Sequence, residues 1–409
     1  MAKIVILGGG FGGIYAAKSL LSKLRGTVHR IVMVSRTETF TFNPLLHEVS
    51  AGFLQESSIT QNIPQILKCP NFEFIKAEVS KISFEEKKIE TSSGSLNYDY
   101  LLVALGSVPN LGLLWKLNAS PDDVYTLKTT QDAAKIKEKL NDLAVKFENS
   151  QSENKKLNIV FIGTGSTAIE IIGEINNFYM QRLKCTSHEG LCNKVSFTML
   201  DKADRILPTV ADSFRNEVIK KLDSEKIRIL PGVDIKKIEN NRIEYAHEDK
   251  TKSMTASMIF LTAGVSPSPV ETDKKCKNEK GFFKVNKYLE IENAKDAWAI
   301  GDNAFYLNPA DNLPVPMLAQ SAKDEGIFVA GNIANKLSGK SQLPYAFHSK
   351  GFLLSVGQGF AVGNVFGKLR KGKFLWWLKR TIYTATFIGC TNKIKKFWLI
   401  SVKTCFKRN

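Results

Sequence analysis

A glycine-rich turn that occurs twice in the chain restricts its fold more than any other feature. In the first copy, the apolar run 3–7 leads into Gly8, Gly10 and Gly13. Apolar residues at helical spacing follow, which predicts a helix after the turn. In a strand–turn–helix of this kind the first glycine permits the tight turn, and the second lets a pyrophosphate approach the backbone. The third lets the helix pack on the strand, and the helix N-terminus attracts the phosphates. The motif therefore predicts a dinucleotide-binding domain.

The same order returns in the middle of the chain. A second apolar run leads into Gly163 and Gly165, and Ala168 takes the place of the third glycine, which is an accepted variant. Residues 101–107 also resemble residues 259–265, because each is an apolar run that reaches a glycine shortly before a proline. Two nucleotide-binding modules in one α/β chain, each closed by such a strand, fit this internal repeat.

The residue after the second strand of each module bears on which nucleotide is bound. An acidic side chain at this place binds ribose hydroxyls. Asp201 fills it in the second module and favours NADH over the 2′-phosphorylated form, although Lys202 and Arg205 lie close by and weaken the inference. In the first module the place falls on Ser35, followed by Arg36, so the usual ribose carboxylate is missing there.

The remaining segments are predicted from composition. Residues 146–156, rich in Asn, Ser, Glu and Lys, predict a solvated linker, and residues 182–194 predict a surface loop. Residues 234–255 are polar and alternate, which favours a hairpin or a meander. Residues 351–367 lack charge but contain several glycines and polar residues, and we expect paired strands there.

The charge of the chain is concentrated at its C-terminal end. Of the net +17, only +2 lies in residues 1–325, because 15 Lys and Arg and no acidic residue follow Glu325. Residues 368–409 contain 12 Lys and Arg interleaved with aromatic residues. On a helix the following residues share one arc, with lysines opposite: Ile394, Phe397, Trp398, Leu399, Val402, Cys405 and Phe406.

This pattern predicts a C-terminal amphipathic helix that lies on an anionic membrane surface. Residues 374–388 are less cleanly divided into two faces. Nucleic-acid binding and a solvated basic tail are the alternatives, but neither needs so continuous an apolar face. No run of about 18 apolar residues occurs, so a membrane-spanning helix is not expected.

Cysteines, histidines and the N-terminus indicate the compartment. Six cysteines without a CxxC pair favour reduced thiols in a cytosol-facing protein. Five scattered histidines give no metal-ligand spacing, so no metal site is expected, and His47 and His348 are interpreted as structural. The first strand begins at Lys3, which leaves no room for a signal peptide and favours the cytoplasmic face of a bacterial inner membrane.

Three further segments complete a family resemblance. Residues 43–52 read Asn-Pro-Leu-Leu-His-Glu-Val-Ser-Ala-Gly, Gly301 precedes Asp302 at a strand end, and residues 316–320 read Pro-Met-Leu-Ala-Gln. With the paired glycine motifs, the chain resembles the two-dinucleotide-binding-domain flavoproteins. Among these it looks most like the type II NADH dehydrogenases, the single-subunit NADH:quinone oxidoreductases.

The resemblance implies an architecture and a reaction. Two Rossmann-like domains would bind FAD and NADH, and a C-terminal helical anchor would hold the chain on the membrane. The implied segments are 1–112 and 271–367 for FAD, 113–270 for NADH, and 368–409 for the membrane. Non-covalently bound FAD would take a hydride from NADH and pass two electrons to a membrane quinone, without proton pumping.

The resemblance also implies site residues. Glu170 and Gln320 would act in catalysis, near the nicotinamide and at the quinone side of the flavin. Otherwise Glu170 is a first-turn glutamate favoured by the helix dipole, and Gln320 an ordinary polar residue at a helix start. The implied cofactor-binding residues are Gly8, Gly10, Gly12, Gly13, Ser35, Arg36, Asn43, Val79, Ala104, Gly106, Asp302, Gln320, Gly163, Gly165, Thr167, Glu170, Asp201 and Gly264.

Rival functions stay open at this point. A sulfide:quinone oxidoreductase on the same scaffold needs a redox cysteine pair, and residues 163–173 and 319–320 contain no cysteine. A disulfide reductase would carry CxxxxC where residues 41–52 have none. A redox-sensing FAD- and NADH-binding interaction protein is the alternative from a different class. No nucleic-acid partner is expected, and the sequence does not decide whether two chains form a homodimer.

Overall fold

A computed structural model describes residues 1–150, 156–184, 194–365 and 367–388. The chain divides into two compact units, and it passes between them several times. Unit 1 consists of Met1–Phe42, Thr60–Val108 and Val265–His348. Unit 2 consists of Asn43–Ile59, Pro109–Gly264 and the described residues from Ser349 onwards.

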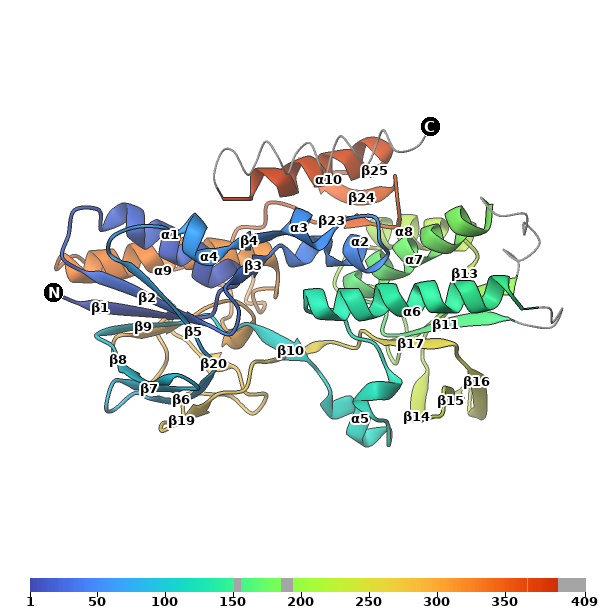
Figure 1. Cartoon of the computed structure of the whole chain (residues 1–409), viewed down its shortest axis with the longest axis horizontal. Coiled ribbons are helices and arrows are strands. Elements are labelled where there is room, and N and C mark those ends of the chain that lie inside the picture. Colours follow the sequence, from blue (N-terminus) through green and yellow to red (C-terminus); the bar gives the residue numbers. More distant parts are fainter. Residues whose placement is uncertain (151–155, 185–193, 366, 389–409) are drawn as a thin grey trace. The chain divides into compact units, whose positions relative to one another are not determined.

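Unit 1 is built on a five-stranded parallel sheet. Its strands, in spatial order, are β21 (Ala297–Ala299), β9 (Tyr100–Val103), β1 (Lys3–Leu7), β2 (Arg30–Ser35) and β5 (Phe72–Lys76). Helices α1 (Phe11–Lys23) and α9 (Ala319–Leu337) lie against each other along one face (Figure 1). The central strand β1 is apolar because it is covered on both faces, and Ile4 to Leu7 are fully buried. The first predicted strand–turn–helix is confirmed.

The other elements of unit 1 are short. A second sheet contains β19 (Glu271–Thr272), β6 (Val79–Ser83), β7 (Lys88–Thr91) and β8 (Gly94–Asn97), in that order. Two-stranded pairs are formed by β3 (Thr39–Thr41) with β4 (Thr60–Asn62), and by β20 (Phe283–Lys284) with β22 (Ala304–Phe305). Helix α4 (Ile63–Ile66) and the 3-10 turn η4 (Gly301–Asn303) complete the unit.

Unit 2 repeats the arrangement with a four-stranded parallel sheet. Its strands, in spatial order, are β13 (Ile227–Leu230), β12 (Val195–Leu200), β11 (Leu157–Ile162) and β17 (Met258–Leu261). Helices α6 (Thr130–Glu148), α7 (Ser166–Lys184) and α8 (Asp212–Ser224) cover one face of this sheet (Figure 1). Phe161 and Phe260 stack on neighbouring strands with ring centroids 4.4 Å apart. The second predicted module is therefore also confirmed.

An antiparallel meander packs on the other face of the unit 2 sheet, as expected for residues 234–255. It consists of β14 (Asp234–Glu239), β15 (Arg242–His247) and β16 (Lys250–Thr255), with α5 (Gly112–Lys116) and η2 (Pro121–Asp123) beside it. Strands β10 (Ser107–Pro109) and β18 (Val265–Pro267) pair with each other. They follow β9 and β17, the two strands whose resemblance the sequence showed.

Two segments that the sequence did not assign to the second module pack in unit 2. The first contains η1 (Asn43–Leu45), α2 (Leu46–Ser50) and α3 (Glu56–Ile59). The second contains β23 (Leu353–Ser355), β24 (Ala361–Val365), β25 (Lys368–Gly372) and α10 (Lys373–Ala385). Strands β23 and β24 pair antiparallel, which confirms the paired strands expected in residues 351–367.

The C-terminal segment differs from the expected tail in its first part. Strand β25 pairs with β24, and α10 buries Leu375 and Trp376 together with the charged Lys379 and Arg380. These charges tolerate burial because each is paired with a carboxylate inside unit 2. The predicted interfacial helix itself, residues 394–406, lies outside the described residues.

Two predicted loop boundaries also shift. Helix α6 continues to Glu148, three residues into the expected linker, because Phe147 on its last turn is buried in the core of unit 2. Helix α7 likewise extends to Lys184, inside the segment expected to form a surface loop. Residues 151–155 and 185–193 lie outside the described residues.

Candidate functional site

The first glycine turn has the geometry that its sequence predicts. Gly8 adopts φ +108°, which favours glycine, and a Cβ on it would lie 2.2 Å from the carbonyl oxygen of Ala104. A Cβ on Gly13 would lie 2.0 Å from the carbonyl oxygen of Gly8, so this glycine lets α1 approach the turn. Gly10, in contrast, has no atom within 4 Å of its Cβ position, and its surroundings are open.

Side chains from three other segments of unit 1 gather at this edge of the sheet. Ser35 follows β2, and its Oγ would lie 2.9 Å from a Cβ on Gly9. Asp302 accepts a 2.5 Å hydrogen bond from Ser107 Oγ, and Asn303 Oδ1 accepts one of 2.9 Å from the amide of Gly106. Parallel strands bring these residues together because their carboxyl ends share one edge.

Glu325 supports the same edge from inside α9. Its Oε2 accepts a hydrogen bond of 2.5 Å from the backbone N–H of Gly301, directly before Asp302. Burial, together with the nearby charges of Asp302 and Asp324, raises the pKa of Glu325 to about 7 against the hydrogen bond from Gly301, which lowers it. The carboxyl group therefore fixes the turn that presents Asp302.

The second glycine turn repeats this geometry in unit 2. Gly163 has φ +109°, and its Cβ would lie 2.7 Å from the carbonyl oxygen of Thr262, whereas Gly165 is open. Asp201 accepts hydrogen bonds from the backbone N–H and the hydroxyl of Thr164, and one of 2.9 Å from the amide of Ala203. The aspartate is thus held at the turn, at the place expected for a ribose-binding carboxylate.

Both turns fit a dinucleotide. Gly10 and Gly165 leave the backbone accessible where a pyrophosphate would approach, and no side chain caps the N-terminus of α1 at Gly10. Neither α1 nor α7 has an acidic residue in the first turn to repel a phosphate. The residues present therefore suit two nucleotide cofactors, one in each unit.

Glu170 lies one turn further along α7, in a cluster of buried polar side chains. Its Oε1 is paired with Lys379 Nζ from α10 and accepts a 3.2 Å hydrogen bond from Ser355 Oγ. Lys379 Nζ also donates to Ser355 Oγ at 2.8 Å, and its side chain is 2 % exposed. His47 from α2 places Nδ1 3.8 Å from Glu170 Oε2.

A second ion pair adjoins the first. Arg380 follows Lys379 on α10, and its Nη1 donates to Glu48 Oε2 at 2.5 Å, with both side chains at most 3 % exposed. Glu174 lies one turn beyond Glu170 on α7, and its Oε2 accepts a 2.6 Å hydrogen bond from Gln358. The cluster thus joins α2, α7, β23 and α10 within unit 2.

The protonation states in this cluster differ sharply between neighbouring carboxyl groups. Burial acts to raise the pKa of Glu170, but the charge of Lys379 and that of His47 outweigh it and lower the pKa below its usual value. Burial and the charge of Glu48 together raise the pKa of Glu174 to about 8, against the hydrogen bond from Gln358 and the charges of Arg380 and Lys379. Burial lowers the pKa of His47, against the charge of Glu170. At neutral pH Glu170 is ionised and Glu174 protonated.

Three side chains of this cluster are of the types that can bind a metal ion. Ligand atoms of His47, Glu48 and Glu174 lie within 4.8 Å of one another. The guanidinium of Arg380 already supplies the positive charge on Glu48, and Glu174 retains a proton that a metal ion would have to displace. The donor set therefore favours the ion-pair network over a metal site.

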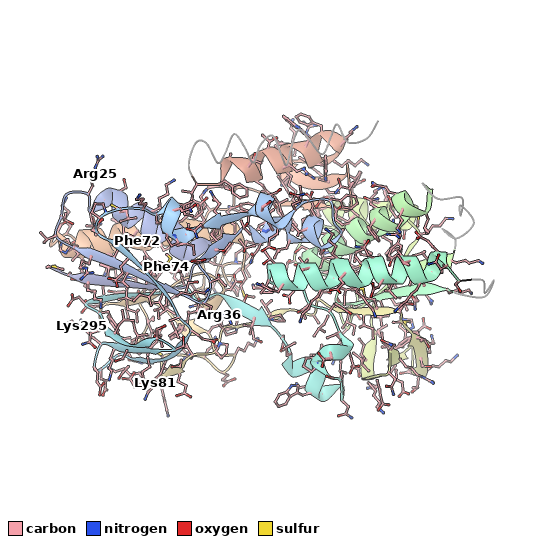
Figure 2. All side chains as sticks on the ribbon, in the orientation of Figure 1. Arg25, Arg36, Phe72, Phe74, Lys81 and Lys295 are labelled. Carbon is pink, nitrogen blue, oxygen red and sulfur yellow. The ribbon has the colours of Figure 1, made fainter. Side chains whose placement is uncertain are left out.

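Other predicted residues are spread more widely. Arg36 is exposed, and its Nη1 lies 3.6 Å from Glu78 Oε1. Figure 2 shows Arg36 at the opposite end of the unit 1 sheet from Arg25 and Lys295. Val79 begins β6 in a different sheet of unit 1. It follows β5 by three residues, and the amide of Ala77 between them donates to the carbonyl oxygen of Ser35 at 3.0 Å, so this segment starts at the edge of the sheet that carries the glycine turn.

Four further predicted residues have separate surroundings. Asn43 is exposed at the start of η1, and Thr167 is exposed on the first turn of α7. Gly12 packs against Ile300, where its Cβ would lie 2.9 Å from the side chain. Gln320 lies on the first turn of α9, and its buried Nε2 has no hydrogen-bond partner among the described residues. A buried unpaired donor suits an acceptor on a ligand.

Sequence reasoning missed several residues that hold the site. Thr164 and Asn303 each adjoin a predicted residue, and a polar side chain next to a turn glycine or to Asp302 was a usable signal. Glu325 follows Gln320 by five residues and gave no local signal. Lys379 was assigned to the basic tail, and nothing in its sequence neighbourhood indicates burial.

Comparison with known proteins identifies the family. A match to the pyridine nucleotide-disulphide oxidoreductase family covers residues 2–326. The chain belongs to this family. Its members are oxidoreductases, which fits the two nucleotide turns, and the predicted superfamily of flavoproteins is thereby confirmed.

Individual relatives within this family are type II NADH:quinone oxidoreductases. The type II NADH:quinone oxidoreductase of Staphylococcus haemolyticus is 27 % identical over 383 residues, which cover 93 % of this chain and 94 % of the relative. The type II NADH:quinone oxidoreductase of Staphylococcus aureus strain NCTC 8325 is 26 % identical over a match that covers 97 % of this chain and 98 % of the relative. These relatives confirm the resemblance to type II NADH dehydrogenases that the sequence motifs indicated.

Solved structures confirm the fold. NDH2 from Plasmodium falciparum in complex with NADH matches 99 % of this chain and 98 % of its own, with a TM-score of 0.87 at 18 % identity. A sulfide:quinone oxidoreductase from Aquifex aeolicus matches 94 % of this chain and 90 % of its own, with a TM-score of 0.77 at 18 % identity. At this identity the likeness concerns the fold alone, so it does not separate the two activities.

Proposed function

We propose that this chain is an NADH:quinone oxidoreductase in which unit 1 binds FAD, unit 2 binds NADH, and a membrane quinone accepts the electrons. The observation that carries the proposal is the presence of two complete nucleotide turns in one chain, each at the carboxyl edge of its own parallel sheet. Relatives of this name that match nearly the whole chain support it. When bound, FAD supplies hydride acceptance and two-electron transfer.

In unit 1 we assign the flavin nucleotide to the first glycine turn. The open backbone at Gly10 and the N-terminus of α1 would receive the pyrophosphate. Asp302, oriented by Ser107, would accept hydrogen bonds from flavin hydroxyls. Gln320 would use its unpaired amide Nε2 to hold a carbonyl oxygen of the quinone. The binding is non-covalent in this proposal.

In unit 2 we assign NADH to the second glycine turn. Gly165 would receive its pyrophosphate, and the carboxylate of Asp201 would accept from the ribose hydroxyls. Because the carboxylate is fixed by Thr164 and Ala203, it could not turn away from a 2′-phosphate and would repel it. Lys202 is 86 % exposed and Arg205 is paired loosely with Asp212, so neither offsets Asp201.

Glu170 and Lys379 are the groups that we assign to proton handling. Reduction of a quinone to a quinol consumes two protons along with two electrons. Lys379 Nζ holds a proton against the ionised Glu170, and Ser355 Oγ bridges the two side chains. The pKa of Lys379 is raised because the attraction of Glu170 outweighs the burial that would lower it. Negative charge on a reduced quinone would draw this proton from Lys379, and a proton from solvent would then restore the pair.

The C-terminal segment is the part that we assign to the membrane surface. Among the described residues no helix is long and apolar enough to cross a bilayer. Helix α10 leaves Phe374 72 % exposed, with Trp377 stacked on it, while Lys379 and Arg380 are buried. This face, with the basic strand β25 beside it, would lie on anionic lipid. We therefore propose peripheral attachment through residues 368–409, on the cytoplasmic side.

The proposal is tested by substituting its two predicted catalytic residues. Glu170→Gln and Gln320→Ala should lower NADH-driven quinone reduction while the ratio of FAD to protein stays that of the wild type. Gln181→Ala, an exposed change near the end of α7 and away from the nucleotide turn, serves as the control for Glu170→Gln. Wild-type turnover in both variants would contradict the catalytic roles assigned to Glu170 and Gln320. Sulfide-driven rather than NADH-driven quinone reduction would favour the alternative enzyme.

A further inference from the structure

A cationic pocket lies at the edge of the unit 2 sheet that faces away from the nucleotide turn. It has a volume of about 450 Å³, and its lining includes residues at or next to the beginnings of β11, β12 and β13. Parallel strands begin at one edge and end at the other. Gly163 and Asp201 follow the ends of β11 and β12, so this pocket is distinct from the site assigned to NADH.

The charge of the pocket has one sign. Lys156, Lys226 and Arg228 line it, and among the described residues no acidic side chain does. Within the described part of the chain, none of these three side chains forms an ion pair or a hydrogen bond. Elsewhere in unit 2, lysines such as Lys221 and Lys236 are paired with carboxylates. Three unpaired cations around one cavity repel one another, and an anion placed between them removes this repulsion.

The rest of the lining suits a phosphorylated ligand. Ser196, Thr198 and Ser257 also line the pocket. The Ser196 hydroxyl lies 3.2 Å from Asn158 Oδ1, and Ser257 Oγ accepts a hydrogen bond from the amide of Asn158. Lysine, arginine and hydroxyl donors together are the usual partners of phosphate oxygens. Phe197 and Met254 add apolar surface to the lining. The volume lies in the range of small-molecule sites, about 300–1,000 Å³.

We infer that this pocket binds a diphosphate-bearing small molecule, with Lys156, Lys226 and Arg228 as the phosphate-binding groups. The phosphate chemistry is shared by free pyrophosphate and by a nucleoside diphosphate. The apolar lining is what would distinguish the second of these. A ligand held here would connect the first residues of β11, β12 and β13, and would stabilise unit 2 by mass action.

The test is calorimetric titration of the full-length, FAD-loaded chain at about 0.1 M salt, where screening of exposed charges is moderate. Titrations are run with and without saturating NAD⁺, because NAD⁺ fills the site assigned to NADH but carries a diphosphate that could also enter the pocket. Inorganic pyrophosphate, ADP and adenosine are compared. Pyrophosphate binding as tight as that of ADP would assign the pocket to phosphate alone, and tighter ADP binding would assign it to a nucleotide. Adenosine binding equal to that of ADP contradicts the inference.

The decisive variant removes two of the cations. Lys226→Ala with Arg228→Ala should weaken diphosphate binding about a hundredfold, since each charged hydrogen-bond donor contributes about tenfold or more. The control, Lys116→Ala with Lys135→Ala, removes the same charge from exposed positions on α5 and α6 and should bind like the wild type. Equal binding by the two double variants, or no binding by the wild type at millimolar ligand, would overturn the inference.

A separate readout keeps this inference distinct from the proposed enzyme activity. NADH-driven bleaching of the flavin should be the same in the pocket variant as in the control, because the pocket lies at the other edge of the sheet from Gly163. Charge reversal, with Lys226→Glu and Arg228→Glu, should abolish diphosphate binding if the alanine variant only weakens it. Retained binding after charge reversal would also overturn the inference.

Discussion

The buried pair of Glu48 and Arg380 gives the sharpest prediction about stability. Both side chains are at most 3 % exposed, and the guanidinium also lies over the ring of Trp376, 4.5 Å from its centroid. Replacing Arg380 by Met keeps most of the volume but leaves Glu48 buried without its counter-charge. Breaking a buried ion pair in this way costs about 3–5 kcal/mol. Loss of the contact with Trp376 adds about 0.5–2 kcal/mol.

The assay is thermal unfolding of unit 2 within the full-length chain. For a unit of this size each kcal/mol corresponds to about 2–4 °C, so Arg380→Met should lower its Tm by roughly 10 °C. Arg370→Met, on the exposed face of β25, is the matched control and should change the Tm by less than about 2 °C. The two transitions of the units need to be resolved, because a single two-state fit does not apply to both.

A double-mutant cycle separates the pair from the packing. Glu48→Gln removes the carboxylate charge, so combining it with Arg380→Met should recover part of the stability lost in Arg380→Met alone. The reasoning is wrong if Arg380→Met unfolds like the control. It is also wrong if the losses of the two single variants simply add, because additive losses mean that the two groups do not interact.

Three further predictions follow from the site. Gly13→Ala should unfold unit 1 at lower temperature, because its Cβ would strike the oxygen of Gly8, whereas Gly10→Ala should keep the stability and lose FAD, as absorbance at 450 nm per protein would show. Asp201→Ala should raise the KM for NADH about tenfold. It should also lower the ratio of kcat/KM for NADH to kcat/KM for NADPH, as steady-state kinetics would show. Glu174, with a pKa raised to about 8, contributes stability that is fully present below about pH 4.5 and is lost as the pH rises through 8. Glu174→Gln should therefore flatten the fall of Tm between pH 5 and pH 8, and an unchanged slope would contradict the assigned protonation.

Much of the fold was predictable because it is encoded locally. The runs before Gly8 and Gly163 are apolar and β-branched, and only strands covered on both faces have that pattern. Asp201 was predictable for the same reason, since its place after β12 follows from the strand order alone.

The cluster around Glu170 was not predictable, because its members come from four distant segments. Lys379 and Arg380 lie among aromatic and basic residues that suit a membrane surface, and only the carboxylates on α7 and α2 account for their burial. Helix α10 buries these two charges together with Leu375 and Trp376 and leaves Phe374 exposed. Hydrophobic periodicity does not predict such a face, since it does not represent long-range ion pairs.

Anaerobic stopped-flow mixing tests the central claim most directly. The FAD-loaded chain is mixed with NADH, and a water-soluble quinone is added in a second mix. We predict rapid bleaching of the flavin absorbance by NADH, followed by its full return on addition of the quinone. A long-lived charge-transfer band that the quinone does not remove would contradict the account and favour a redox-sensing protein.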